Sequence, residues 1–190
     1  MQQIDLFAPS SPALPGGFRY QPDVLTADEQ EALVERIAPL PFKEFEFQGD
    51  IGKRRVVSYG WKYDFTTRQL ERSADIPGFL LPLRERAASF AGMAAERLQQ
   101  ALVTEYGPGA PIGWHKDKAV FGEVVGVSLL SPCTFRLRRK AGAGWERVSL
   151  TAEPGSMYLL SGPSRTEWEH SIPPGEQLRY SVTFRNFKGE

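Results

Sequence analysis

From residue 98 onward the chain is a succession of short strand-like segments separated by glycine and proline, and this pattern limits the fold more than any other feature. The segments are rich in β-branched and aromatic residues, as strands are. The predicted strands cover residues 98–106, 124–130, 133–138, 146–151, 156–161 and 178–187. We therefore expect a sheet-dominated core in the second half of the chain.

Two helices are predicted before these strands. Thr26-Ala27-Asp28-Glu29 is a capping box that begins the first helix, and Pro39 ends it. The second helix covers about Leu81 to Met93. Helices first and many short strands afterwards indicate the α+β class, with a double-stranded β-helix (jelly-roll) core. Residues 1–17 are predicted to form a flexible or loosely docked N-terminal arm, and residues 18–190 a single domain.

The net charge and the local charge give opposite indications about binding to nucleic acid. The formal net charge is zero, whereas a nucleic-acid binder usually carries a net positive charge. Two local clusters are basic, namely Lys53-Arg54-Arg55 and the group Arg136, Arg138, Arg139 and Lys140. Either cluster on its own is more typical of an ordinary solubilising surface.

Composition places the chain among globular proteins, with 41% hydrophobic and 24% charged residues. The single cysteine, Cys133, cannot form an intramolecular disulfide, which is typical of a reducing compartment. We see no signal peptide and no apolar run of membrane length. The expectation is a cytoplasmic protein without a membrane partner or an obligate protein partner.

The candidate chemistry lies in His115, Asp117 and His170. The first two form a His-x-Asp pair, and alternate residues of a strand face the same way. The chain contains only two histidines, and both belong to this set. Two imidazoles and one carboxylate make the facial triad of non-heme Fe(II) oxygenases, which leaves coordination positions open. The alternative is that each histidine is an ordinary hydrogen-bonded residue of a strand.

The last predicted strand carries two arginines on one face. Residues 179, 181, 183 and 185 (Arg, Ser, Thr, Arg) share that face, opposite an apolar stripe. An unpaired buried charge is costly, and a guanidinium matches a carboxylate bidentately. A dicarboxylate cosubstrate would satisfy both arginines; a solvated strand face is the alternative.

With these motifs the chain resembles the AlkB-like Fe(II)- and 2-oxoglutarate-dependent dioxygenases, from about Arg54 to Phe187. Three blocks carry the resemblance, in the family's order and spacing: Tyr106 to Lys118 (YGPGAPIGWHKDK), Ser161-Gly162-Pro163-Ser164-Arg165 leading to His170, and Arg179 to Arg185.

The resemblance implies a role for each matched residue. His115, Asp117 and His170 would bind iron, and O2 would take an open position. Tyr106 and Arg179 would hold the far carboxylate of 2-oxoglutarate, with Arg185 near its C1 end. Two asparagines that touch 2-oxoglutarate in the best-known bacterial member are here Thr104 and Ser181, whose hydroxyls still donate. An acidic residue that contacts the damaged base there is here Ala119, which cannot make that contact and so leaves the base preference open.

The aromatic segment Tyr59 to Thr66 corresponds to the family's substrate lid; edge-strand packing is the alternative. Tyr63 and Phe65 share a face if the segment is extended, and aromatic faces stack on bases at about 1–3 kcal/mol per base. The residues expected to contact substrate are Trp61, Tyr63 and Phe65 of the lid and Lys118, Arg138 and Arg139 at the mouth.

The resemblance implies oxidative demethylation of N-alkylated bases in single-stranded DNA or RNA, and hence alkylation repair or RNA demethylation. In this reaction 2-oxoglutarate becomes succinate and CO2, and the methyl group leaves as formaldehyde. Two alternatives remain open. One is an oxygenase of the same fold that acts on a protein side chain or a small molecule, and the other is a non-catalytic jelly-roll binding module.

Overall fold

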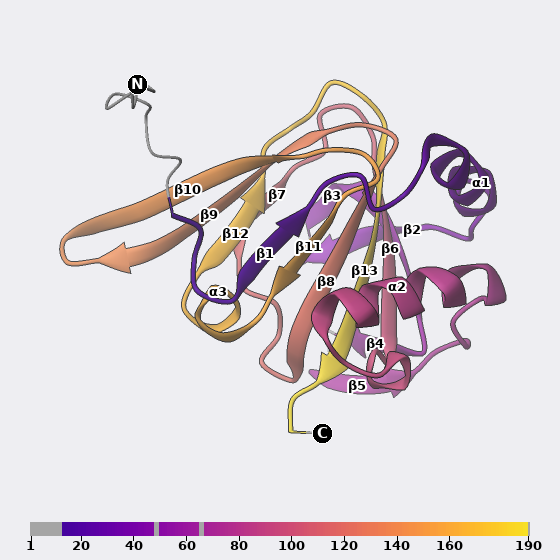
Figure 1. Cartoon of the computed structure of the whole chain (residues 1–190), viewed down its shortest axis with the longest axis horizontal. Coiled ribbons are helices and arrows are strands. Elements are labelled where there is room, and N and C mark those ends of the chain that lie inside the picture. The colour runs from indigo at the N-terminus through magenta and orange to yellow at the C-terminus, as the bar shows by residue number, and fades with distance from the viewer. Residues whose placement is uncertain (1–12, 48–49, 65–66, 190) are drawn as a thin grey trace, which may run out of the picture.

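The computed structural model describes residues 13–47, 50–64 and 67–189, and its core is two antiparallel sheets that face each other. The larger sheet has the strand order β1-β11-β8-β13-β6-β3-β2, and the smaller sheet has the order β10-β9-β12-β7. A separate hairpin, β4-β5, lies beside them. Helices α1 and α2 lie on one side of the larger sheet, and the long hairpin β9-β10 extends away from it on the opposite side (Figure 1).

The element bounds are as follows. The helices are α1 Ala27–Ile37, α2 Leu81–Ala91 and α3 Gly162–Thr166, with 3-10 turns at Gly78–Leu80 and Ala95–Arg97. The strands are β1 Phe18–Gln21, β2 Lys43–Phe47, β3 Asp50–Tyr59, β4 Trp61–Asp64, β5 Gln69–Arg72, β6 Gln100–Tyr106, β7 Ile112–His115, β8 Phe121–Leu129, β9 Cys133–Ala141, β10 Gly144–Ala152, β11 Met157–Leu160, β12 Glu169–Ile172 and β13 Arg179–Phe187.

This arrangement confirms the predicted α+β jelly-roll. Each of the six strands predicted after residue 98 is present, with its ends shifted by a few residues. Four strands of four residues were not predicted: β1, β5, β7 and β12. Four residues are too few for alternation to stand out from the neighbouring loops, and two of these strands carry the histidines.

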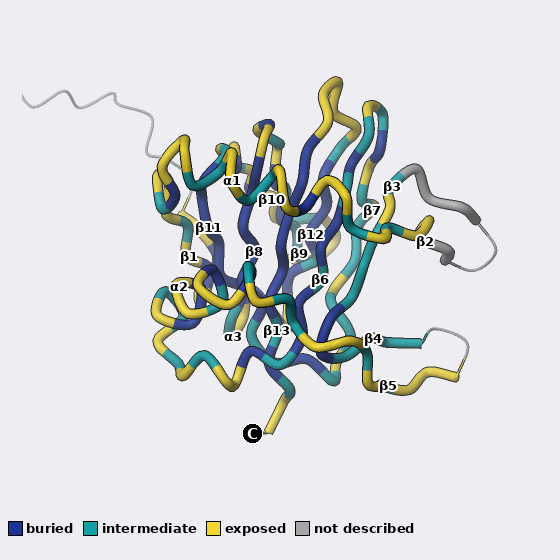
Figure 2. Tube along the Cα trace, turned by 90° about the vertical axis from the view of Figure 1, so that its right-hand side faces the viewer, coloured by how far each residue is buried: buried dark blue, intermediate teal, exposed yellow. Residues whose placement is uncertain are grey.

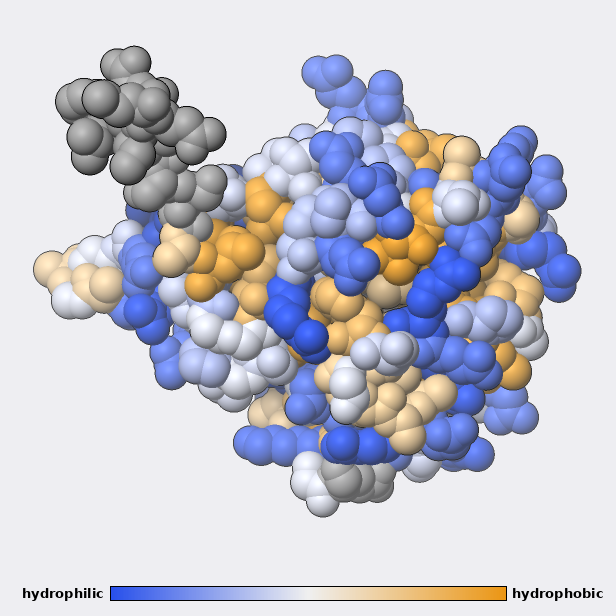
Figure 3. Space-filling view, viewed as in Figure 1, coloured by the Kyte–Doolittle hydropathy of each residue, from blue (hydrophilic) through white to orange (hydrophobic). Residues whose placement is uncertain are grey.

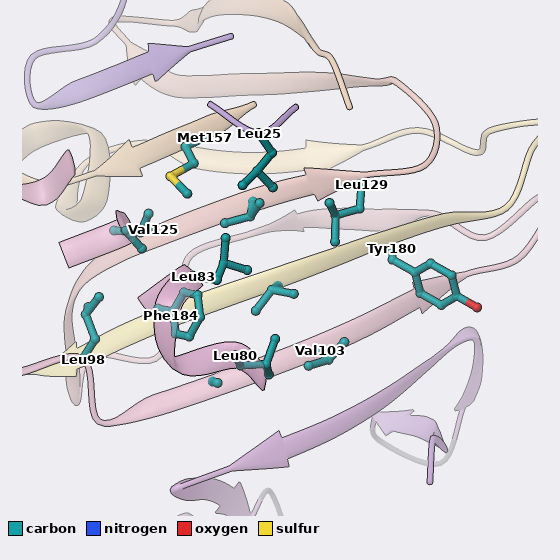
Figure 4. Close-up of a cluster of buried hydrophobic side chains, with 14 of the residues drawn as sticks. Leu25, Leu80, Leu83, Leu98, Val103, Val125, Leu129, Met157, Tyr180 and Phe184 are labelled. Atoms are coloured by element: carbon teal, nitrogen blue, oxygen red, sulfur yellow. The ribbon is translucent and has the colours of Figure 1, made fainter. Parts of the chain in front are cut away.

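Strand β13 separates two cores, as its alternation predicts. Tyr180, Val182 and Phe184 point toward the helices and pack with Leu80, Leu83 and other apolar side chains (Figure 4). The opposite face of β13 points between the two sheets, where a second apolar cluster includes Phe135 and Tyr158. Figure 2 shows β13 and its neighbours β6 and β8 as mostly buried strands. The site therefore lies on a rigid, central part of the larger sheet.

Local signals set the helix ends. The Thr26 side chain accepts a hydrogen bond from the Glu29 backbone, and the Glu29 side chain accepts one from the Thr26 backbone, so the predicted capping box is confirmed. Helix α2 ends at Ala91, two residues before the predicted Met93, because Gly92 adopts a left-handed φ of 75°.

The predicted arm, residues 1–17, lies mostly outside the described residues, which begin at position 13. Its described end is docked: the Gly17 carbonyl accepts hydrogen bonds from the backbone and the hydroxyl of Ser161. Among the described residues, no helix is long and apolar enough to cross a membrane. On the face that carries the helices, hydrophobic patches are separated by hydrophilic residues (Figure 3).

Candidate active site

The two histidines meet because their strands pair. His170 of β12 lies directly opposite His115, the last residue of β7, and the ring centroids are 4.2 Å apart. Asp117 follows two residues after β7 ends, and its Oδ2 lies 3.6 Å from His170 Nε2. Each of the three residues offers one donor atom, and the three atoms lie within 4.8 Å of one another. An irregular segment after β7, not the strand alternation that we expected, thus places Asp117.

The protonation states fit a divalent metal. Burial, and then the neighbouring His115, lowers the pKa of His170 to about 3, so its imidazole is neutral. The His115 Nδ1 lies 2.9 Å from the Gly113 carbonyl, which can only accept, so Nε2 is left for a metal. Burial alone would raise the pKa of Asp117, but the charge of Arg185, with smaller effects from the histidines, lowers it overall. Two imidazole nitrogens and a carboxylate are the donors of a non-heme Fe(II) site.

Arg185 is held by the protein itself. Its Nη2 lies 2.7 Å from Asp117 Oδ1, its Nε donates to the same oxygen at 2.8 Å, and its Nη1 donates to Gln100 at 3.0 Å. The expectation that a dicarboxylate is needed to satisfy both arginines therefore does not hold for Arg185. Gln100 was not among the predicted site residues, because a single glutamine in a strand has no distinctive pattern.

Arg179, in contrast, has an unused donor. It is 4% exposed, its guanidinium lies 4.9 Å from the Tyr106 ring centroid, and its Nε donates to Ser128 at 3.1 Å. Its Nη1 is enclosed and has no hydrogen-bond partner among the described residues. Both Arg179 and Tyr106 line a cavity of about 260 Å³. An unpaired buried guanidinium donor is costly, and a carboxylate such as the far end of 2-oxoglutarate would satisfy it.

Thr104 and Ser181 lie in one row with Ser128, because β6, β13 and β8 pair in register at these positions. All three side chains are buried. They occupy the inner face of the larger sheet between Arg179 and Arg185. The structure thus places both predicted hydroxyls on the wall between the two arginines.

The predicted substrate residues divide into two groups. Lys118 and Tyr63 come together: the Lys118 ammonium lies 5.2 Å from the Tyr63 ring centroid, and Lys118 follows Asp117 directly. Trp61 packs edge-on against Phe187, with the centroids 5.5 Å apart. Phe65 lies outside the described residues.

The two arginines expected at the mouth are both paired with carboxylates of the protein. Leu137 pairs with His170, so Arg138 points to the opposite face of the smaller sheet, where its Nε donates to Glu169 at 2.7 Å. Arg139 forms ion pairs with Glu146 and Glu167. Alternation thus turns Arg138 away from the His170 face of the sheet. Arg139 shares that face with Leu137, but its guanidinium is engaged by the two carboxylates.

Arg165 was quoted in the sequence only as part of a block, but it shapes the site. It is 8% exposed and donates to the backbone carbonyls of Lys118, Phe121 and Gly122. Lys118 belongs to the loop that follows Asp117, and Phe121 and Gly122 begin β8, so Arg165 ties that loop to the start of the strand. No periodic pattern could have predicted this contact, since its partners are backbone atoms.

Comparison with known proteins agrees with this geometry. Residues 17–185 match the family model described as the 2OG-Fe(II) oxygenase superfamily. The "Alkylated DNA repair protein ALKBH8 homolog" of Arabidopsis thaliana is 30% identical over 184 residues, covering 84% of this chain and 51% of the relative. The "tRNA (carboxymethyluridine(34)-5-O)-methyltransferase ALKBH8" of Mus musculus is 24% identical over 171 residues, covering 85% of this chain and 25% of the relative.

The chain thus spans about half of the plant relative and a quarter of the mouse relative. Among solved structures, OsALKBH1 shares the fold with a TM-score of 0.69 at 18% identity, covering 92% of this chain and 98% of that chain. The family match extends over most of the chain and includes both histidine strands and β13 as far as Arg185. The chain therefore belongs to the 2OG-Fe(II) oxygenase superfamily, as an AlkB-like member that uses Fe(II), 2-oxoglutarate and O2.

Proposed function

We propose that this dioxygenase removes alkyl groups from N-alkylated bases in single-stranded DNA or RNA. The observation that carries the proposal is the contact of Lys118 with Tyr63 directly beside Asp117. A cation suits a phosphate, and an aromatic ring suits an unstacked base. An enzyme that acts on a base needs both, because the base must leave its stack to reach the reacting centre.

Within this proposal His115, Asp117 and His170 hold the iron, and Arg179 with Tyr106 holds the far carboxylate of 2-oxoglutarate. Thr104 and Ser181 line the wall between these two ends. Iron, 2-oxoglutarate and O2 together supply the oxidation of the alkyl group when they are bound.

Two further arginines hold other site residues in place. Arg185 keeps Asp117 ionised and fixed as a ligand, because its Nε donates to one carboxylate oxygen and its Nη2 forms an ion pair with the same oxygen. Arg165 holds the loop that carries Lys118, so the cation keeps its place beside the Tyr63 ring.

The names of the relatives support a nucleic-acid substrate at the level of class. One is named for repair of alkylated DNA and another for a tRNA uridine, although this chain spans only part of each. We further propose a cytoplasmic location, because a lone cysteine suits a reducing compartment.

The test is release of formaldehyde from a panel of methylated single-stranded DNA and RNA oligonucleotides, with consumption of 2-oxoglutarate measured in parallel. Tyr63→Ala should lower demethylation at least fivefold, since loss of one stacking contact costs about 1–3 kcal/mol. The matched control is Lys62→Ala. Lys62 is the neighbour of Tyr63 on β4 and forms an exposed ion pair with Glu71, so its loss should leave turnover unchanged.

Oligonucleotides that neither bind nor stimulate consumption of 2-oxoglutarate would refute the nucleic-acid substrate. The alternative function, an oxygenase that acts on a protein side chain or a small molecule, would then replace the proposed one. Failure to retain iron after anaerobic reconstitution would instead favour the non-catalytic binding module.

A further inference from the structure

Tyr158 lies between the two sheets but has no part in the site described so far. It belongs to β11, is 7% exposed, and its ring stacks on Phe18 and lies 4.5 Å, centroid to centroid, from Phe135. Phe135 in turn stacks on the metal-site residue His170 at 5.5 Å. The phenol ring is thus fixed in an aromatic layer that ends at the metal site.

A glycine sets the direction of the ring. Tyr158 pairs across the sheet with Gly126 of β8, and a Cβ built on Gly126 would overlap the Cζ and the hydroxyl of Tyr158. The outer end of the phenol therefore lies on the backbone of Gly126, where any side chain would displace it. Gly126 pairs in turn with Thr183 of β13, so the end of the phenol lies over β8, one strand away from β13.

This direction brings the hydroxyl next to the wall between the two arginines, because Gly126 pairs with Thr183 of that wall. Thr183 lies four residues after Arg179 and two residues before Arg185, on the same face of β13. A dicarboxylate held by Arg179 and directed toward the metal ligands must pass over this row. The electrostatics agree. Besides burial, the charge of Arg179 lowers the pKa of Tyr158 and the charge of Asp117 raises it, so the phenol lies near both groups.

The hydroxyl is available as a donor. No hydrogen bond joins it to another group in the described part of the chain, whereas Tyr20 and Tyr180 each have a partner. Burial raises the pKa of Tyr158 well above its ordinary value, so the phenol keeps its proton at physiological pH. A neutral phenol can donate one hydrogen bond to an anion.

We propose that Tyr158 is a positioning residue for the cosubstrate, and that its hydroxyl donates a hydrogen bond to bound 2-oxoglutarate between Arg179 and the metal ligands. This rests on the placement of 2-oxoglutarate in the proposed function. Gly126 then serves the same contact, because its lack of a side chain leaves the space that the phenol occupies next to the cosubstrate.

The test measures binding of 2-oxoglutarate by calorimetry to protein loaded with Zn(II) in place of Fe(II), without nucleic acid. Tyr158→Phe keeps the ring packing and removes only the hydroxyl. Its dissociation constant for 2-oxoglutarate should rise about tenfold or more, as for loss of a hydrogen bond to a charged group. Gly126→Ala, which displaces the ring end, should produce a rise of similar size. Combining the two substitutions should add little, because both remove one contact.

The matched control is Tyr180→Phe, which removes a hydroxyl from the opposite face of β13 and should leave the affinity for 2-oxoglutarate unchanged. Arg179→Ala in the same assay tests the placement of the cosubstrate separately. If Arg179→Ala weakens binding and Tyr158→Phe does not, Tyr158 serves packing alone and the inference is wrong. If neither weakens binding, the placement of 2-oxoglutarate in the proposed function fails as well. Because no nucleic acid is present, failure of the proposed substrate would not alter this result.

Discussion

Replacing Arg185 with methionine should destabilise the metal-free protein strongly. The guanidinium makes two contacts to one oxygen of Asp117, at 2.7 and 2.8 Å, and the Asp117 side chain is 7% exposed. Methionine fills similar space but leaves the carboxylate buried without its main counter-charge.

The expected cost follows from this geometry. Removing one partner of a buried ion pair costs about 3–5 kcal/mol, a large share of a total stability of roughly 5–15 kcal/mol. For a chain of this size each kcal/mol lowers the melting temperature by about 2–4 °C, so a fall of about 6–20 °C is expected.

The assay is urea and thermal unfolding of wild type and Arg185→Met, each with and without Zn(II). A bound divalent cation supplies positive charge to Asp117, so the difference between the two proteins should narrow when the metal is added. The control is Arg55→Met, which breaks an ion pair to Glu105 whose arginine is half exposed. That change should cost under about 1 kcal/mol.

Two results would refute the reasoning. One is a destabilisation by Arg185→Met no larger than that of Arg55→Met. The other is a difference between variant and wild type that stays the same when the metal is added. In the first case the Asp117 charge is compensated elsewhere, and in the second the cation does not bind at Asp117.

Three further predictions concern separate parts of the molecule. His170→Ala or His115→Ala should abolish metal-dependent turnover while the circular dichroism spectrum stays native; full activity of either variant would disprove the triad. Phe184→Ala should lower the free energy of unfolding by about 3–5 kcal/mol, because Phe184 is fully buried between β13 and the helices; a loss under about 1 kcal/mol in urea unfolding would contradict that packing. Hydrogen bonding from Arg86 lowers the pKa of Glu29 from 4.5 to about 2, so the stability it contributes is present above pH 4.5 and lost as the pH falls toward 2. The stability difference between wild type and Glu29→Gln should accordingly shrink in acid, and a difference that grows there would contradict the assignment.

Local patterns predicted the elements well where they were long or chemically distinctive. The capping box at Thr26 and the alternation of β13 both carry their information within a few consecutive residues, and both are confirmed. The strands β7 and β12 were missed because four residues give too little alternation. The motif nevertheless identified His115 and His170, since the residue types of a metal site are visible without the strand that carries them.

Charge runs were less informative than residue types. The cluster from Arg136 to Lys140 suggested a single basic surface, but consecutive strand residues alternate between faces. The structure divides the cluster, with Arg138 paired to Glu169 on one side and Arg139 paired to Glu146 and Glu167. The sequence shows that the charges exist but not which carboxylates neutralise them.

The sequence by itself determined the class of fold, the identity of the three candidate metal ligands and the face of β13 that carries Arg179 and Arg185. These depend on residue type and on a period of two, which are local properties. Only the tertiary structure decided how the two arginines differ. Arg185 is satisfied by Asp117 and Gln100, whereas Arg179 keeps an enclosed, unpaired donor. The partners that distinguish them come from strands and loops distant in the sequence, and only the packing of the two sheets brings those segments together.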